Sequence, residues 1–374
     1  MTLRDTPPFR ADHVGSLLRP APLLEAREKR ATGEISADQL RVIEDEAIRD
    51  VVRMQRDVGL RTATDGEFRR TSWHMDFIYQ LGGVHRTDEK IQVHFRNADG
   101  ELDFESAALV IDEPVRLVDT IFGDDFRFLS LAVEQGQTAK LTIPSPSMVH
   151  YRGGRAAISP SVYPDEDQFW SDLSAAYATQ VARVADLGCR YLQLDDTSLA
   201  YLNDPAQRDL LASRGDDAAH QHLRYIKQIN AAIGDRPADM AVTTHMCRGN
   251  FRSSWAAEGG YDFVAEALFS ELAVDGFFLE YDDDRSGGFA PLRFVPPGKM
   301  VVLGLVTTKR GELESKDTLK RRIDEAARYV PLEQLCLSPQ CGFSSTVEGN
   351  ALTYDQEVAK LRLIAEVAAE VWGQ

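Results

Sequence analysis

The sequence has few cysteines, no long uncharged hydrophobic run and a deficit of positive charge. Its four cysteines are too few and too scattered for a disulfide framework: Cys189, Cys247, Cys336 and Cys341. No stretch approaches the roughly 18 uncharged apolar residues that a membrane span needs. Residues 1–8 also lack the apolar core of a secretory signal. We therefore expect a cytoplasmic protein without a membrane span.

Acidic residues outnumber basic ones: the chain has 59 aspartates and glutamates and 42 lysines and arginines, which gives a formal net charge of −17. Phosphate binding requires basic surface, so this balance argues against a nucleic-acid partner. Hydrophobic residues make up 43% of the chain and charged residues 27%, as in a folded protein rather than a disordered one. We expect small-molecule substrates. The sequence does not determine the oligomeric state and is compatible with a homo-oligomer.

Strands alternate with amphipathic helices along most of the chain. The clearest helix begins at Ser36, which forms a capping-box pair with Gln39, and its apolar residues recur every three or four positions until Gly59. Further helices are predicted at 169–184, 317–329 and 354–372. Eight segments are predicted as strands: 11–14, 61–64, 141–143, 191–194, 240–244, 276–279, 300–305 and 334–337. Eight such repeats predict the α/β class and one (β/α)8 TIM barrel spanning residues 1–374.

Residues 82–138 interrupt this alternation. Segments 94–96 and 102–104 flank the turn-like residues 97–100, a pattern that predicts a β-hairpin. The segment comes after the second strand–helix unit. We therefore expect an insertion that passes over one mouth of the barrel.

Polar residues follow the predicted strands, where the chemistry of such a barrel lies. Four of them offer an imidazole, two thiolates and a carboxylate, a set that suits zinc: His245, Cys247, Glu280 and Cys341. In an extended segment, the side chains of residues 245 and 247 point to the same side. Cysteine is, however, often a small core hydrophobe, the role we assign to Cys189 and Cys336. Spacing alone leaves a zinc site and ordinary packing as equal alternatives.

With these residues, the chain resembles the catalytic C-terminal barrel of cobalamin-independent methionine synthase, and especially its shorter single-barrel relatives. The resemblance covers residues from about 10 to 350. His245-Met246-Cys247, Glu280 and the Pro-Gln-Cys-Gly that contains Cys341 match the family's four zinc ligands in order and strand position. The resemblance therefore implies a zinc cofactor. Zinc would deprotonate a substrate thiol, whose pKa of about 8.5 leaves it mostly protonated at neutral pH.

The resemblance also implies a site for homocysteine, formed by Gly15, Ser16, Glu67 and Asp195. Two carboxylates supply the negative charge that an amino-acid ammonium group requires. Simpler roles remain open for both, because Asp195 could cap a helix and Glu67 could pair with a neighbouring arginine.

On the donor side, the family stacks the pterin ring of a methylated tetrahydrofolate on an aromatic residue, usually Trp. Tyr151 stands at the corresponding place in this chain, and a tyrosine can also stack. Tyr201 stands where the family has a pterin-contacting acid, and Lys309 stands where it has its catalytic histidine. Lys309 is therefore the predicted catalytic residue, with His74 or His150 as the alternative acid.

The resemblance implies a zinc-dependent methyltransferase that moves a methyl group from a 5-methyltetrahydrofolate-type donor to the thiol of homocysteine, forming methionine. Two alternatives remain open. One is a zinc-dependent alkyltransferase that uses another thiol or donor, such as coenzyme M with an epoxide. The other is a non-catalytic barrel that binds a thiol, an amino acid or a metal. Basic residues in the predicted mouth loops would suit an anionic donor: Arg19, Arg69, Arg70, Arg152, Arg155, Lys309 and Arg310.

Overall fold

The computed structural model describes residues 4–97 and 100–373, apart from the side chains of Ser106 and Ala107. A parallel sheet forms its centre, with the strands β5 Leu141–Pro144, β6 Tyr191–Asp196, β7 Ala241–Met246, β8 Gly276–Glu280, β9 Met300–Val306 and β10 Leu335–Pro339. These strands are hydrogen-bonded in the order β10-β9-β8-β7-β6-β5. Each overlaps a predicted strand, which confirms a mixed α/β fold with a parallel sheet.

The first two predicted strands are shorter than expected. β1, Thr62–Ala63, pairs in parallel with β4, Thr138–Ala139, rather than joining the six-stranded sheet. The predicted strand at 11–14 is reduced to one parallel bridge between Ala11 and Leu337. Here the carboxylate of Asp12 accepts the backbone N–H groups of its neighbours Phe9 and His13, and such local bonds compete with a strand ladder. The closed eight-stranded barrel therefore stays a prediction.

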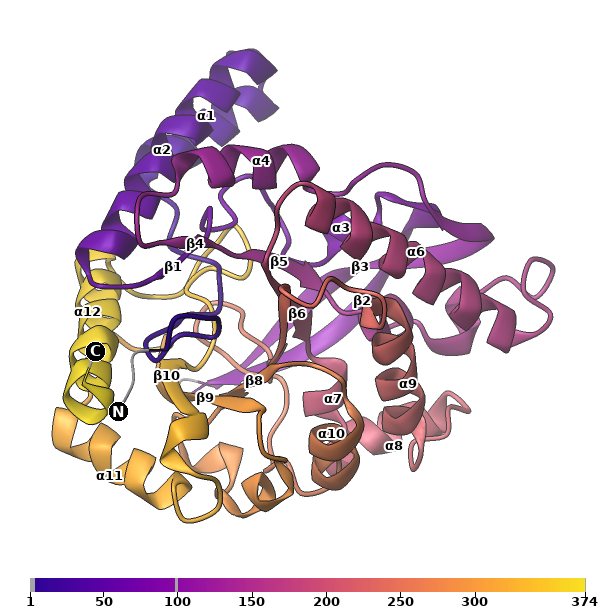
Figure 1. Cartoon of the computed structure of the whole chain (residues 1–374). Helices are drawn as coiled ribbons and strands as arrows, with labels where there is room; N and C mark the ends of the chain where they lie inside the picture. Colours follow the sequence, from indigo (N-terminus) through magenta and orange to yellow (C-terminus); the bar gives the residue numbers. More distant parts are fainter. Residues whose placement is uncertain (1–3, 98–99, 374) are drawn as a thin grey trace.

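The helices lie around the outside of the strands (Figure 1). The predicted N-terminal helix is α2, Ala37–Asp57, and its Ser36–Gln39 capping box is present. The other three predicted helices correspond to α6 Glu166–Asp186, α11 Lys316–Ala326 and α12 Tyr354–Trp372. Further helices are α1 Ala21–Ala31, α3 Met75–Ile78, α4 Gly123–Ala132, α5 Ser147–Tyr151, α7 Ser198–Tyr201, α8 Pro205–Ser213, α9 Gln221–Ile233 and α10 Ala265–Glu271. Short 3₁₀ helices are η1 Gly154–Ala157, η2 Asp284–Ser286, η3 Ala290–Phe294 and η4 Leu332–Gln334. Over the described ranges, no helix is long and apolar enough to cross a membrane.

The predicted hairpin is present and much longer than expected. β2, Leu81–Asn97, pairs in antiparallel fashion with β3, Gly100–Leu117. Residues 98 and 99 of the predicted turn lie outside the described residues. Near its tip, the hairpin meets the loop that follows β7, where the backbones of Arg96 and Trp255 exchange hydrogen bonds of 2.7 and 2.8 Å.

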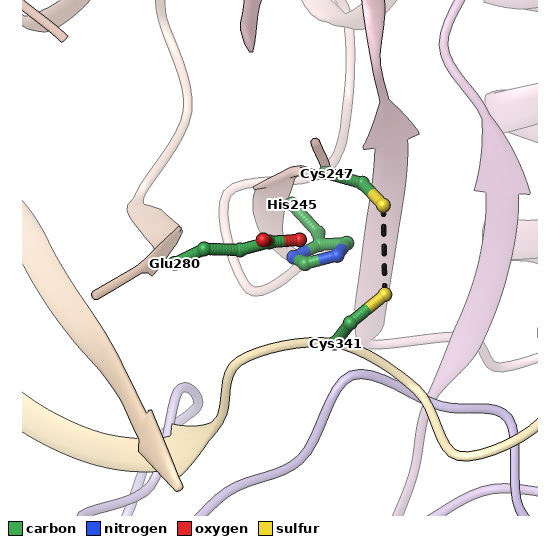
Figure 2. A group of neighbouring side chains, drawn as sticks. All are labelled: His245, Cys247, Glu280 and Cys341. Carbon is green, nitrogen blue, oxygen red and sulfur yellow. Dashed lines mark hydrogen bonds between the residues drawn. The ribbon is translucent and has the colours of Figure 1, made fainter. Parts of the chain in front are cut away.

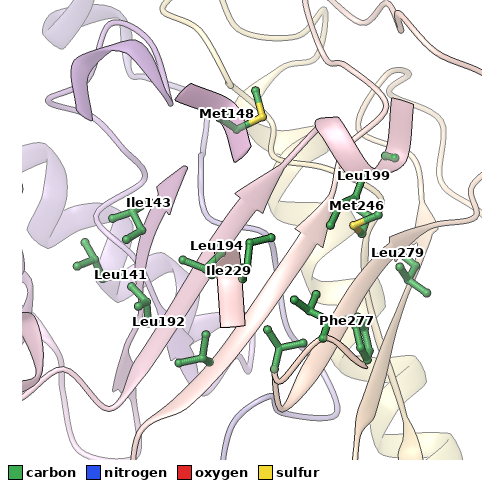
Figure 3. Packing of buried hydrophobic residues seen from close by; sticks show 14 of the residues in the cluster. Leu141, Ile143, Met148, Leu192, Leu194, Leu199, Ile229, Met246, Phe277 and Leu279 are labelled. Carbon is green, nitrogen blue, oxygen red and sulfur yellow. The ribbon is translucent and has the colours of Figure 1, made fainter. Parts of the chain in front are cut away.

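Buried apolar side chains fill both faces of the parallel sheet, because successive strand residues point to opposite sides. Figure 3 shows one face, where Ile229 of α9 lies beside Leu194 of β6, and Leu192 and Phe277 belong to the same buried cluster. The other face carries a smaller cluster of Val14, Phe278, Met300, Val302 and Cys336. Cys189 and Cys336 are fully buried, as their assignment to packing predicted.

Candidate metal centre and cavity

Four side chains at the carboxyl ends of the strands converge on one point (Figure 2). His245 lies on β7, Cys247 directly follows it, Glu280 ends β8 and Cys341 follows β10. One ligand atom from each lies within 4.8 Å of the others, and all four side chains are buried. Two sulfurs bound to one tetrahedral zinc at about 2.3 Å each would be about 3.8 Å apart. The observed Sγ–Sγ distance is 3.5 Å, so the four groups could hold such an ion.

His245 gives an independent test of this fit. Both ring nitrogens are buried, and neither has a hydrogen-bond partner among the described residues. Buried polar atoms are rarely left without a partner, because desolvation is then uncompensated. Burial opposes protonation of His245, yet the neighbouring Cys341 sulfur raises its pKa. A metal ion would satisfy one ring nitrogen, so His245 fits the role of a ligand.

The two thiols contact each other through their sulfur atoms, 3.5 Å apart. The hydrogen bond between Cys247 and Cys341 lowers the pKa of Cys341 well below its usual value and raises that of Cys247. The backbone N–H of Gly249 also donates to Cys247 Sγ at 3.3 Å. The site therefore favours one thiolate with a second sulfur beside it. Two such sulfur donors suit a borderline-soft cation.

Two arginines orient Glu280, and neither was singled out from the sequence. The backbone N–H of Arg248 donates to Glu280 Oε1 at 3.1 Å, and Arg285 Nη2 lies 3.5 Å from Oε2. The buried Arg248 guanidinium is itself bonded to the Tyr261 hydroxyl at 2.9 Å and the Gly259 carbonyl at 2.6 Å. Burial raises the pKa of Glu280. The sequence carries no signal for this support, because it arises only when the loops after β7 and β8 meet.

A cavity of about 420 Å³ adjoins the metal ligands. His245, Cys247 and Cys341 line it together with three of the residues predicted to hold homocysteine: Ser16, Glu67 and Asp195. The remaining one, Gly15, adopts φ +150°, and a Cβ atom there would lie 2.7 Å from Thr142 Cγ2. Gly15 thus lets the first loop pass close to β5 and brings Ser16 to the cavity.

The two predicted carboxylates are both buried in the cavity wall. Thr142 Oγ1 donates to Glu67 Oε1 at 2.7 Å, and Arg70 Nη1 lies 3.4 Å from the same oxygen, whereas Oε2 has no partner among the described residues. Glu67 adopts a left-handed backbone with φ 60°, a conformation that costs energy in a non-glycine residue. Gln193 Nε2 donates to Asp195 Oδ1 at 2.6 Å. Burial raises the pKa of both carboxyls, that of Asp195 to about 7.

The predicted donor-side residues lie elsewhere. Within the described chain, neither Tyr151 nor Lys309 is among the residues that line the cavity. Tyr151 is buried, and its hydroxyl donates to Gln207 Oε1 at 2.9 Å. Lys309 Nζ lies 3.5 Å from Asn250 Oδ1, and Asn250 does line the cavity. Of the two alternative acids, His74 lines the cavity. The other, His150, is not a lining residue and is buried against Trp170 and the Tyr225 hydroxyl.

Most of the predicted basic patch has structural partners. Arg19 donates to the carbonyls of Glu67 and Arg70, and Arg69 forms ion pairs with α2. Arg155 donates to two nearby carbonyls. Arg152 lines the cavity. It is joined there by residues that sequence reasoning missed: Trp73, Tyr79, Arg86, Lys90, Phe95, Phe104 and Phe251. Four of these belong to the hairpin, whose docking has no signature in the sequence.

Comparison with known proteins agrees with this fold. Residues 9–370 match the family described as "Cobalamin-independent synthase, Catalytic domain". The chain is 47% identical to the uncharacterized protein YxjH of Bacillus subtilis, over 98% of this chain and 95% of that protein. A solved structure from Listeria monocytogenes, which bears the name of a vitamin-B12-independent methionine synthase, is 39% identical, with a TM-score of 0.78 over 99% of each chain. A B12-independent methionine synthase from Shewanella sp. W3-18-1 shares the fold, at 17% identity and a TM-score of 0.69 over 97% of each chain.

These matches identify the class as an enzyme of the cobalamin-independent synthase type. The chain belongs to the family of cobalamin-independent methionine synthase catalytic domains. The resemblance drawn from the sequence is thereby confirmed.

Proposed function

We propose that the protein is a zinc-dependent methyltransferase that transfers a methyl group from a 5-methyltetrahydrofolate-type donor to the thiol of homocysteine, forming methionine. One observation carries the proposal: a His-Cys-Glu-Cys cluster and two buried carboxylates line or adjoin the same cavity. A zinc ion held by His245, Cys247, Glu280 and Cys341 would keep the substrate thiol deprotonated and in place. The cluster supplies the site for sulfur, and the carboxylates supply the site for an amino acid.

Glu67 and Asp195 recognise the ammonium group of homocysteine in this proposal. Both carboxylates are buried, and Glu67 Oε2 lacks a partner among the described residues. A substrate cation would replace the hydration that burial removes. Ser16 lies on the same wall, and its loop packs so tightly on the Cys341 loop that a Cβ at Gly342 would fall 1.9 Å from Ser16 Oγ. The amino-acid site and the sulfur ligands therefore share one support.

Methyl transfer from a tertiary amine requires a proton source near the donor nitrogen, because the methyl group leaves readily only when that nitrogen carries positive charge. We propose Lys309 for this role. Its ammonium group contacts Asn250 on the cavity wall. His74 is the alternative, since it lines the cavity directly. Replacement of each residue in turn, Lys309→Met and His74→Asn, with single-turnover measurement of methyl transfer, identifies which of them supplies the proton.

The second candidate is alkyl transfer to another thiol, such as coenzyme M with an epoxide donor. It is favoured by the neutral Tyr201 hydroxyl on the cavity wall, at the place where the resemblance implies an acid. Glu67 and Asp195 favour homocysteine instead, because a sulfonate thiol has no ammonium group to pair with them. The two candidates therefore differ in which thiol the cavity accepts.

The test combines metal analysis with a screen of thiols and methyl donors. After reconstitution, the protein should bind about one equivalent of zinc per chain. It should form methionine from homocysteine and 5-methyltetrahydrofolate, and it should leave coenzyme M unmodified. A zinc content below about 0.2 equivalents after reconstitution contradicts the metal site. Turnover of coenzyme M but not of homocysteine selects the second candidate.

A further inference from the structure

One carboxylate oxygen of Glu280, a candidate metal ligand, is connected through the backbone to the loop after β7. Its Oε1 accepts the backbone N–H of Arg248 at 3.1 Å. The carbonyl of Arg248 in turn accepts the N–H groups of Ala256 at 2.9 Å and Ala257 at 3.1 Å. A path of backbone hydrogen bonds therefore leads from the carboxylate to the two residues that directly follow Trp255.

The other carboxylate oxygen is connected to the same segment through side chains. Arg285 Nη2 lies 3.5 Å from Glu280 Oε2, and the Arg285 side chain is only 7% exposed. An ion pair with Asp282, at 2.9 Å, holds the guanidinium in place. The guanidinium carbon lies 4.9 Å from the centre of the Trp255 ring, which is within the range of a cation–π contact. Both oxygens of Glu280 thus lead to residues 255–257.

Trp255 also holds the tip of the β2–β3 hairpin. Its backbone exchanges two hydrogen bonds with the backbone of Arg96 on β2. Phe251, in the same loop, contacts Phe95 and Phe104 of the hairpin, with ring centres 5.6 and 4.4 Å apart. One segment of the chain therefore contacts the support of the metal ligand on one side and the hairpin on the other.

We propose that Arg285 is a positioning residue for Glu280 and that, through Trp255, it couples metal binding to docking of the hairpin tip. When Glu280 is held as a ligand, Arg285 and Trp255 keep the arrangement in which the loop pairs with Arg96. The coupling is reciprocal, so a docked hairpin also strengthens metal binding. The inference rests on the metal site of the proposed function and links that site to the hairpin that lines the same cavity.

Zinc affinity gives the first measurement, with Zn²⁺ alone as the probe and a chromogenic chelator as the competitor. Arg285→Met keeps the length of the side chain but removes its charge and hydrogen bonds, and it should raise the zinc Kd of the full chain about tenfold. Arg293→Met is the matched control. Arg293 lies in the same connection between β8 and β9, is exposed, and lies 4.3 Å from the Phe294 ring. Its replacement should change the zinc Kd less than about twofold.

Hydrogen exchange gives the second measurement, because the amides of Arg96 and Trp255 join the hairpin tip to the loop. In the wild-type protein, saturating zinc should slow the exchange of both amides about tenfold. In Arg285→Met, at a zinc concentration that saturates the variant, this protection should fall to less than about twofold. A purely structural role for Arg285 would instead change the exchange equally with and without zinc.

Two substitutions at Trp255 examine the contact with Arg285. Trp255→Phe keeps an aromatic face for the guanidinium, whereas Trp255→Leu removes it, and both keep the backbone that pairs with Arg96. Trp255→Leu should raise the zinc Kd about threefold and weaken the zinc-dependent protection of the Arg96 amide. Trp255→Phe should keep both values near those of the wild-type protein. Equal losses in the two variants overturn the proposed coupling.

The outcomes separate the coupling from the proposed function. If zinc binds to the wild-type protein but leaves the exchange of the two amides unchanged, the coupling is wrong and the metal site stands. Unchanged zinc affinity and unchanged protection in Arg285→Met also overturn the coupling. If zinc protects the amides in an Arg285-dependent manner but no methionine forms from homocysteine, the coupling stands and the proposed function fails. A wild-type protein that binds less than about 0.2 equivalents of zinc overturns both.

Discussion

The cavity is lined by two regions, a floor and a cover, that are built in different ways. The floor, which we define as His245, Cys247, Cys341, Glu67 and Asp195, consists of buried side chains on strands or in the loops directly after them. The cover is the β2–β3 hairpin, most of whose described side chains are exposed or half-buried. Its tip is held by the Arg96–Trp255 backbone pair and by an aromatic cluster of Phe95, Phe104 and Phe251.

In the proposed function, this difference assigns the chemistry to the floor and the selectivity for the donor to the cover. Groups on a rigid sheet keep the geometry that metal binding and charge recognition need, because the surrounding core fixes their rotamers. A hairpin attached at its root and its tip can vary in sequence without disturbing that geometry. We therefore expect substitutions in the floor to abolish binding or catalysis, and substitutions in the cover to change affinity for the donor.

The largest effect should follow loss of a sulfur from the floor. Cys341→Ser removes one of the two soft donors, so zinc content should fall below about 0.2 equivalents and methyl transfer should fall about 1,000-fold or more. The control is Cys336→Ala, which removes a thiol from the buried strand next to the same loop. The zinc content of both variants is measured by plasma emission, and their methyl-transfer activity by the turnover assay. Full zinc content in Cys341→Ser would show that the ion is held by other groups.

The next effect concerns the charge of the floor. Glu67→Gln keeps the shape of the side chain and its contact with Thr142 but removes the negative charge. The KM for homocysteine should rise about 10- to 100-fold, because an ion pair becomes a neutral hydrogen bond, while the zinc content stays the same. Glu105→Gln alters a carboxylate on the cover that lines the same cavity, and it should change KM less than twofold. Equal effects of the two substitutions would break the distinction between floor and cover.

The sequence predicts the floor well and the cover poorly, for physical reasons. The carboxyl ends of parallel strands meet at one edge of the sheet. Residues 245, 247, 280 and 341 end or follow such strands, so the sequence predicts that they lie close together. Six strands and the Ser36 cap followed from local periodicity and hydrogen bonding. Hairpin length and docking depend instead on tertiary contacts such as that between Arg96 and Trp255.

The sequence does not indicate which aromatic residues face the cavity, for a related reason. Tyr151 and Tyr201 both end short helices after neighbouring strands, so position along the chain does not indicate which of them lines the cavity. Only the packing of one ring behind the other separates them. Trp73 lies in the loop after Glu67, where no helix or strand periodicity fixes its direction.

A smaller effect tests the contact between α12 and the chain next to the Ser16 loop. Leu18, next to the Ser16 loop, donates its backbone N–H to the buried Glu357 of α12 at 2.9 Å. Burial raises the pKa of Glu357 from 4.5 to about 8. The folded protein therefore holds this proton more tightly than the unfolded chain does, and stability is lost as pH rises from about 4.5 through 8.

Glu357→Gln removes this pH dependence. Its unfolding free energy relative to wild type should increase by about 3 kcal/mol between pH 5.5 and pH 9. The control is Glu370→Gln on the same helix, where pairing with Lys320 and Lys316 lowers the pKa of the exposed carboxyl to about 2. The stability of that variant relative to wild type should not change over this pH range. Urea unfolding at both pH values provides the measurement, and identical behaviour of the two variants would show that Glu357 is ionised in the folded protein.

The smallest effect is expected from the cover itself. Phe104 lies on β3, is half-buried, and contacts the Phe251 ring at 4.4 Å. Phe104→Ala should therefore lower the unfolding free energy by only about 1 kcal/mol, whereas Leu194→Ala, in the packed core behind the floor, should lower it by about 2–5 kcal/mol. The Kd for 5-methyltetrahydrofolate should rise in Phe104→Ala while zinc content stays the same. If both variants lose the same stability, the hairpin unfolds together with the core, and floor and cover form one cooperative unit.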